Sequence, residues 1–211
     1  MAKIKVGGNT KNAQENAASS KKLRTRDLIY AGAFGAIYLV VMLIIVMASG
    51  MIPVLYLAVP LTVGAVCGTI YEMCVLKVRK FGAALILGIL FALVACTSEG
   101  FVSIVPAIAA AVLAELIIFL GKYKSKFMYL LSFIVFNLNM ACPFIGLQVA
   151  RDEFLAKCVE FYGQDYANQL AALAPDWIVL VEIGLAIAGG IIGAFIASKL
   201  IKKHFQTAGV M

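Results

Sequence analysis

Charged residues are scarce in this chain. Asp, Glu, Lys and Arg make up 14% of its 211 residues and hydrophobic residues 63%, whereas an average soluble domain is about a quarter charged and about half apolar. This composition excludes a cytosolic enzyme, a nucleic-acid-binding protein and a secreted disulfide scaffold. A membrane-spanning helix takes about 20 apolar residues, so five or six of them would use most of the chain. We therefore expect a small polytopic membrane protein embedded in a lipid bilayer.

Histidine is almost absent, because His204 near the C-terminus is the only one. Zinc sites built on His, metalloprotease sites and Ser–His catalytic arrangements are therefore excluded. The sequence also lacks the G-x-x-x-x-G-K-[ST] loop that binds ATP phosphates. We expect no catalytic residue, no metal and no cofactor, and any use of ATP would require a partner.

Six apolar segments follow a polar, basic tail at residues 1–26 that shows no apolar periodicity and is expected to be disordered. Each segment can cross a bilayer as a helix, although the third, at 17 residues, must then stand nearly upright. The predicted fold class is all-α, a six-transmembrane-helix bundle over residues 27–203, with a short tail at 204–211. The segments are 28–48, 51–76, 81–97, 101–121, 127–149 and 177–200.

The basic residues favour one orientation of this bundle. Sixteen of the 18 Lys and Arg lie in the N-terminal tail or on the side of the membrane that it occupies, and only Arg151 and Lys157 lie on the other side. The positive-inside rule places the richer side in the cytoplasm, so both termini are expected to be cytoplasmic. The net charge of +7 is thus an orientation signal, and we expect no nucleic-acid partner.

The long outer segment at residues 150–176 shows short runs of apolar residues near helical spacing, with Gly163 as a stop between them. It is predicted to form one or two short helices on the outer surface. Two interpretations remain open, an ordinary interfacial segment and a lid over a pocket.

Ionisable residues inside membrane spans are candidates for function because their burial is costly. Glu182 lies about one and a half turns below the outer end of the sixth segment and shares a face with Ala186, Gly189 and Gly193. No Lys or Arg occupies the outer half of any segment. A bound cation, a protonated carboxyl and a hydrogen-bonding ligand are the alternatives for this side chain.

Further polar groups are expected near the same outer end. Asn137, Phe144 and Gln148 share a face of the fifth segment, although a buried Asn is as often a contact between helices as part of a ligand site. Prolines cluster toward the outside too, which suggests that any cavity opens there. The candidate substrate-binding residues are Thr97, Ser98, Glu99, Asn137, Phe144, Gln148 and Glu182.

Small residues at four-residue spacing mark places where helices approach closely. In the sixth segment they predict a seam inside the bundle. The first segment carries two overlapping pairs, which either form one more internal seam or dock another membrane subunit. The candidate docking residues are Ala31, Gly32, Gly35 and Ala36.

Two stretches resemble a known family. K-L-R-T-R-D-L-I-Y-A-G-A-F-G-A-I-Y at Lys22–Tyr38 and A-E-L-I-I-F-L-G-K-Y-K-S at Ala114–Ser125 are similar to the substrate-binding S components of energy-coupling factor (ECF) transporters, and more narrowly to their Trep_Strep group. The resemblance covers residues 22–203 and includes six spans with both termini inside.

The resemblance implies a function that periodicity alone does not. S components capture a micronutrient, often a vitamin or its precursor, outside the bacterial cell membrane, and associate with a transmembrane coupling subunit (the T component) and two cytoplasmic ATPases. The family's docking motif maps onto Gly32 and Ala36, with Gly in place of the common first Ala. Glu99, Asn137, Gln148 and Glu182 fit the family's binding region in position only. The motifs of thiamin, riboflavin and biotin members are not found.

Two other functions are weighed against this one. A self-sufficient, proton-coupled secondary transporter would use Glu182 as its titrating group, but the internal repeat that often marks such folds is not apparent. An intramembrane enzyme or a structural subunit is the third, and the chain lacks the metal-ligand set or nucleophile–base pair that an enzyme needs.

Overall fold

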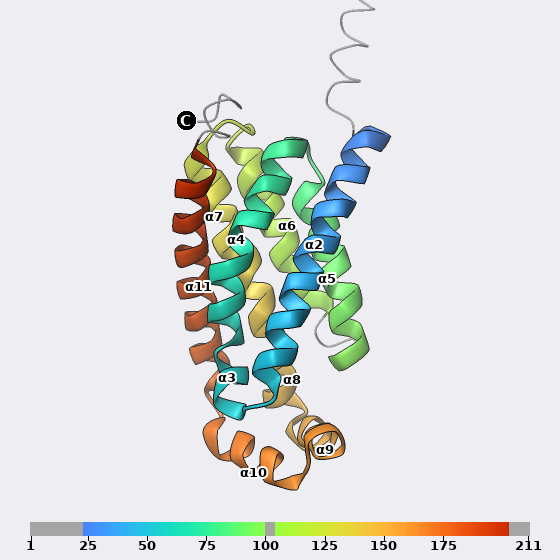
Figure 1. Cartoon of the computed structure of the whole chain (residues 1–211), viewed down its shortest axis with the longest axis vertical. Coiled ribbons are helices and arrows are strands. Elements are labelled where there is room, and N and C mark those ends of the chain that lie inside the picture. Colours follow the sequence, from blue (N-terminus) through green and yellow to red (C-terminus); the bar gives the residue numbers. More distant parts are fainter. Residues whose placement is uncertain (1–22, 100–103, 203–211) are drawn as a thin grey trace, which may run out of the picture.

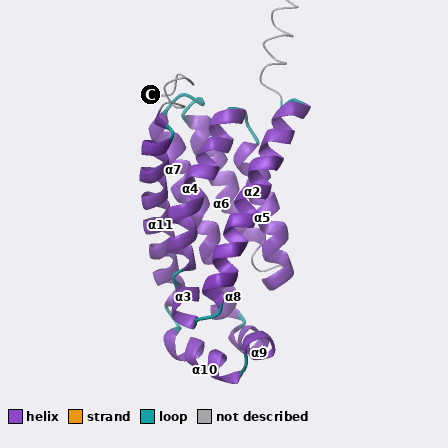
Figure 2. Ribbon diagram, viewed as in Figure 1, coloured by secondary structure: helices purple, strands orange, loops and turns teal. Residues whose placement is uncertain are grey.

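The structure, a computed structural model, describes residues 23–99 and 104–202, without the side chains of residues 96–99. Within these ranges the chain is 88% helical and contains no strand, which confirms the all-α prediction (Figure 2). The helices are α2 (Thr25–Gly50), α3 (Pro53–Leu57), α4 (Val59–Val78), α5 (Ala83–Glu99), α6 (Ile104–Leu120), α7 (Lys126–Phe136), the 3-10 helix η2 (Asn137–Ala141), α8 (Cys142–Val149), α9 (Arg151–Tyr162), α10 (Gln164–Leu173) and α11 (Ile178–Leu200).

The long helices run side by side, as Figure 1 shows, with α7, η2 and α8 stacked end to end as one rod. Helices α3, α9 and α10 lie together at one end of the bundle, which we call the α10 end. The first residues of α2 and the last residues of α11 lie at the other end, which we call the terminal end (Figure 1). The chain therefore starts and finishes its bundle on the same side.

Four stretches are long and apolar enough to cross a membrane: α2, α4, the rod from Lys126 to Val149, and α11. Helices α5 and α6 have 17 residues each and fall short by length, so the count of six spans stays a prediction. Many outward-facing side chains on the long helices are apolar, such as Ile44 at 63% and Leu180 at 71% exposure. This distribution suits a bundle surrounded by lipid.

Two predicted continuous segments are broken in the structure. The second divides at Ala58 into α3 and α4, and the fifth passes through η2 into α8. Pro53, Pro60 and Pro143 each lie in the first turn of a helix, where the missing N–H removes no intrahelical hydrogen bond. These prolines therefore begin new helices instead of kinking continuous ones.

Glycines bring α4 and α11 into backbone contact. A Cβ atom added to Gly68 would lie 2.7 Å from the carbonyl carbon of Gly193, and one added to Gly189 would lie 2.6 Å from the carbonyl oxygen of Leu61. The spacing of small residues in the sixth segment predicts such an internal seam. Because the two helices meet without intervening side chains, this pair forms the most closely packed part of the bundle.

Aromatic side chains fill the centre of the bundle beside this seam. The ring of Tyr71 lies 4.7 Å from that of Phe136 and 5.3 Å from that of Phe133, measured between centroids. The hydroxyl groups of Tyr71 and Ser132 are hydrogen-bonded at 3.2 Å. This part of the interior is therefore tightly filled.

Candidate functional site

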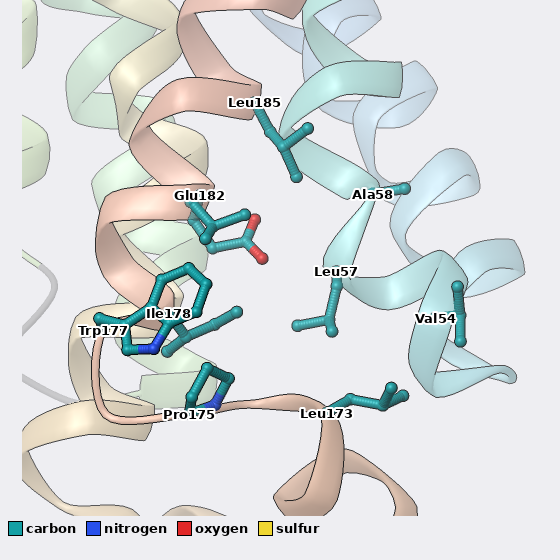
Figure 3. Close-up of a pocket in the computed structure, with 10 residues that line it drawn as sticks. Val54, Leu57, Ala58, Leu173, Pro175, Trp177, Ile178, Glu182 and Leu185 are labelled. Carbon is teal, nitrogen blue, oxygen red and sulfur yellow. The ribbon is translucent and has the colours of Figure 1, made fainter.

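A pocket of about 390 Å³ opens at the α10 end, between α3, the start of α11 and the segment that joins α10 to α11 (Figure 3). Its walls are aliphatic or aromatic apart from a single carboxylate. Residues that form these walls include Leu57, Ala58, Leu173, Trp177, Ile178 and Glu182.

Glu182 is the only ionisable side chain in this pocket lining. Its side chain is fully buried, and neither carboxylate oxygen has a hydrogen-bond partner within the part of the chain that the structure describes. In Figure 3 the carboxylate extends from α11 toward Leu57 and Ala58 on the other side of the pocket. A buried carboxylate without a partner is costly to the free protein, which marks this position as a candidate binding group.

Broken helices place Glu182 opposite irregular backbone. Pro60 has no N–H to continue a helix back through Ala58, so α3 ends and α4 begins at the level of the pocket. Pro175 interrupts the chain before α11 starts at Ile178. Non-helical backbone at membrane depth is tolerated where it lines a cavity, and discontinuous helices form the binding sites of many transporters.

Residues 150–176 form two short helices, as the sequence predicts, joined at Gly163, whose φ of 91° suits glycine. Leu173 and Pro175 contribute to the pocket wall. The guanidinium of Arg151 donates a hydrogen bond of 2.8 Å to the carbonyl of Ala171 and so ties the start of α9 to α10. The end of this segment therefore forms part of the pocket wall, and its two interpretations stay predictions.

The structure separates the polar residues that the sequence placed around one pocket. Asn137 is buried deeper in the bundle, where its Nδ2 donates hydrogen bonds to the carbonyl oxygens of Pro60 at 3.0 Å and Ala186 at 2.7 Å. Asn137 thus serves as a contact between helices. Gln148 is exposed on the surface of α8 and does not line the pocket.

Phe144 lies behind the pocket. Its ring is 5.3 Å from that of Tyr56, and it packs in one cluster with Ile178, which does line the pocket. The side chains of Thr97, Ser98 and Glu99 lie outside the described part of the structure. Of the candidate substrate-binding residues, Glu182 is therefore the one that the structure places in the pocket lining.

Sequence reasoning missed most of the pocket. Its walls are made by residues such as Leu57 and Leu173, which are indistinguishable in the sequence from residues that face lipid or core. Trp177, although 60% exposed, also lines the pocket. The one usable signal was the proline pair that breaks the second segment.

The carboxylates at the terminal end have different roles. Glu115 accepts hydrogen bonds from the backbone N–H of Ala84 at 2.8 Å and from the hydroxyl of Tyr123 at 3.2 Å, so it caps the start of α5. Burial, followed by the charge of Glu115, raises the pKa of the Tyr123 phenol. Glu72 is fully buried, and its oxygens have no hydrogen-bond partner among the described residues.

The two pairs of small residues on α2 face different surroundings. Ala31 and Gly35 are buried, and a Cβ atom added to Gly35 would lie 2.5 Å from Cδ1 of Leu90 on α5. By contrast, a Cβ added to Gly32 would meet no described atom within 4 Å, and Ala36 is exposed. The docking prediction is therefore corrected for Ala31 and Gly35, which form an internal seam, while Gly32 and Ala36 stay available to a partner.

Within residues 23–99 and 104–202, no group of three or more His, Cys, Asp or Glu side chains is placed to hold a metal ion. Glu182 in particular stands alone in its pocket lining. What the site offers is one buried carboxyl group in an apolar cavity.

The chain belongs to the Trep_Strep family of hypothetical bacterial integral membrane proteins, whose family model matches residues 25–207. No curated protein and no solved structure matches the chain. The family establishes an integral membrane protein, in agreement with the apolar helices of the structure.

Proposed function

We propose that this chain is the substrate-binding S component of an ATP-driven ECF-type importer. It would capture a vitamin-like or other micronutrient small molecule at the extracellular face of the bacterial cytoplasmic membrane. Its partners would be a transmembrane T component and two cytoplasmic ATPases, and the chain would have no enzymatic activity of its own. The resemblance of Lys22–Tyr38 and Ala114–Ser125 to S components is one support for this proposal.

The observation that carries the proposal is the pocket at the α10 end, with Glu182 buried in it. Its size falls in the range of small-molecule sites, about 300 to 1,000 Å³. The pocket lies at the end of the bundle opposite the start of α2 and the end of α11 (Figure 1). The chain thus has a place to hold a solute, and it carries no phosphate-binding loop with which to use ATP.

Charge supports an outward-facing pocket. Lys77 lies in the last turn of α4, and Lys80, Lys122 and Lys124 follow α4 and α6 at the terminal end. By contrast, Arg151 is one of only two basic residues in the segment 150–176 beside the pocket. Under the positive-inside rule the terminal end is cytoplasmic and the α10 end extracellular. Six helices would then cross the membrane, with α5 and α6 standing close to its normal.

The outer face of α2 supports docking to the T component. Gly32 and Ala36 leave a flat strip at which another helix can approach closely. These are the positions onto which the docking motif of S components maps. A large side chain at Gly32 should block that approach without disturbing the pocket, which lies at the far end of the bundle.

Gly32→Leu and Gly184→Leu test this proposal as a matched pair. A Cβ atom added to either glycine, one on α2 and one on α11, would meet no described atom within 4 Å. We expect Gly32→Leu to abolish co-purification with the T component and ATPases, and uptake by cells, while Gly184→Leu leaves both intact. Uptake that persists in Gly32→Leu, or a T component that never co-purifies with the unmodified chain, would contradict the proposal.

A proton-coupled secondary transporter is the second candidate, because Glu182 is buried without a partner among described residues. Liposomes that contain only this chain distinguish the two functions. Solute accumulation driven by a pH gradient, and lost in Glu182→Gln, would favour the secondary transporter, whereas an S component should not accumulate solute alone.

A further inference from the structure

We infer that the pocket around Glu182 takes an organic cation, a small molecule in which a protonated amine is attached to an apolar body. This inference rests on the proposed function only in treating the pocket as the capture site. It concerns the charge and polarity of the ligand, which neither the family nor the S-component role specifies.

The charge of the ligand follows from what surrounds Glu182. None of the residues that line the pocket is basic, and neither carboxylate oxygen accepts a hydrogen bond within the described part of the chain. An ammonium group would donate to this carboxylate and neutralise it in a medium where an unpaired charge is costly. An anionic ligand would add a second negative charge to the same cavity, and a neutral one would leave the first uncompensated.

Two smaller occupants satisfy the carboxylate less well. A metal ion needs several ligands, and no cluster of three candidate side chains exists among the described residues. A proton alone would turn the carboxylate into a donor, but the side chains around it are apolar and offer the new O–H no side-chain acceptor. A protonated amine supplies both the positive charge that neutralises the carboxylate and the N–H donors that its oxygens lack.

The apolar body follows from the walls. Leu57, Ile178 and Leu185 present aliphatic surface to the cavity, and Trp177 adds an aromatic ring at its edge. As Figure 3 shows, these side chains surround the position of the carboxylate. Polyols and phosphorylated molecules would lose water at these walls without gaining hydrogen bonds, whereas a hydrocarbon or aromatic group would gain burial, and a cationic group would gain from the ring of Trp177.

Three probes with one skeleton test the inference on the purified full-length chain. They are 2-phenylethylamine, 2-phenylethanol and 3-phenylpropanoate, which share a phenyl ring on a short chain and differ in charge. Binding is read from the rise in the midpoint of thermal unfolding over a range of concentrations. We expect the amine to bind at least about tenfold more tightly than the alcohol, with no binding of the acid.

Glu182→Gln and Glu72→Gln form the matched pair of variants. Both glutamates are fully buried and lack hydrogen-bond partners among the described residues, but Glu72 lies near the terminal end of α4. The preference for the amine should disappear in Glu182→Gln and persist in Glu72→Gln. If Glu182→Gln does not fold, labelling of the unmodified chain with dicyclohexylcarbodiimide replaces it, because the amine should then protect Glu182 but not Glu72.

Equal binding of the three probes, tighter binding of the alcohol or acid, or no effect of the amine at about 10 mM would overturn the inference. So would an amine preference that survives in Glu182→Gln, or an amine that leaves the labelling of Glu182 unchanged. These results are independent of docking, since the isolated chain is used. An amine preference without assembly onto a T component would refute the proposed function and leave this inference standing. Assembly onto a T component without an amine preference would refute this inference and leave the proposed function standing.

Discussion

The side-chain amide of Asn137 donates a hydrogen bond of 2.7 Å to the backbone carbonyl of Ala186. The same nitrogen donates to the carbonyl of Pro60 at 3.0 Å, so a single amide connects η2 with both α4 and α11. A Cβ atom on Gly64 would lie within contact distance of that nitrogen. The absence of a side chain at Gly64 therefore leaves space for the amide of Asn137. This junction fixes the broken rod against the glycine seam just below the pocket.

Replacement of Asn137 by Ala should destabilise the protein by about 1 kcal/mol, because two buried carbonyl groups lose a donor. Asn139→Ala is the matched control, since Asn139 is equally buried but neither of its polar atoms has a partner within the described residues. Thermal unfolding in detergent measures both. A loss in Asn139→Ala as large as that in Asn137→Ala would show that the hydrogen bonds of Asn137 contribute little.

The close contact of α4 and α11 at their glycines gives a second prediction about stability. Gly193→Ala would push a methyl group into the backbone of Gly64 and to within 2.9 Å of the Phe133 ring, and overpacking of this kind costs about 1 to 3 kcal/mol. Gly184→Ala meets no atom within 4 Å and should be neutral or stabilising, because alanine favours the helix. If both variants unfold at the same temperature, α4 and α11 do not pack as closely as described.

Membrane orientation can be read from cysteines placed at the two ends. Glu160 on α9 and Lys124 between α6 and α7 are both exposed at the surface. A membrane-impermeant maleimide added to intact cells should modify Glu160→Cys and spare Lys124→Cys until the cells are lysed. The unmodified chain gives the background from its own cysteines. The opposite pattern would place the pocket in the cytoplasm and contradict import from outside.

Cys158 provides a prediction about pH. Burial raises the pKa of its thiol above the usual value, so the folded chain holds less reactive thiolate near neutral pH than an exposed cysteine does. Iodoacetamide should modify Cys158 more slowly than it modifies the cysteine of Glu160→Cys at pH 7.5. The rate at Cys158 should rise as the pH is increased. Equal rates at neutral pH would mean that α10 does not cover this side chain.

Hydropathy and small-residue spacing predict much of this fold. The apolar segments became the long helices, because runs of this length satisfy their backbone hydrogen bonds only as helices in lipid. The position of Glu182 relative to Gly189 and Gly193 also followed from helical periodicity, which fixes the side of a helix on which a residue lies. Prediction therefore succeeded for features that depend on the sequence of a single helix, such as its extent and the face on which a residue lies.

Contacts between helices were not predictable in the same way. Asn137 and Gln148 share a face of an ideal helix, yet the chain from Asn137 to Ala141 forms the 3-10 helix η2. The altered winding leaves Asn137 buried and Gln148 exposed. The apolar walls of the pocket carry no signal, since leucine suits lipid, core and cavity alike. Which of these three surroundings a leucine has depends on the helix that packs beside it. The sequence of its own segment does not specify that neighbour.

The arrangement on α2 separates the internal packing of this helix from the surface that it presents outside the bundle. Adjacent residues on a helix are about 100° apart around its axis, so a shift of one position takes Ala31 and Gly35, which pack inside, to Gly32 and Ala36, which face outward. Substitutions at the outward pair alter the external surface and leave the internal contacts alone. In evolutionary terms, mutations at Gly32 and Ala36 can change the outer surface of α2 while the packing of Ala31 and Gly35 inside the bundle is kept.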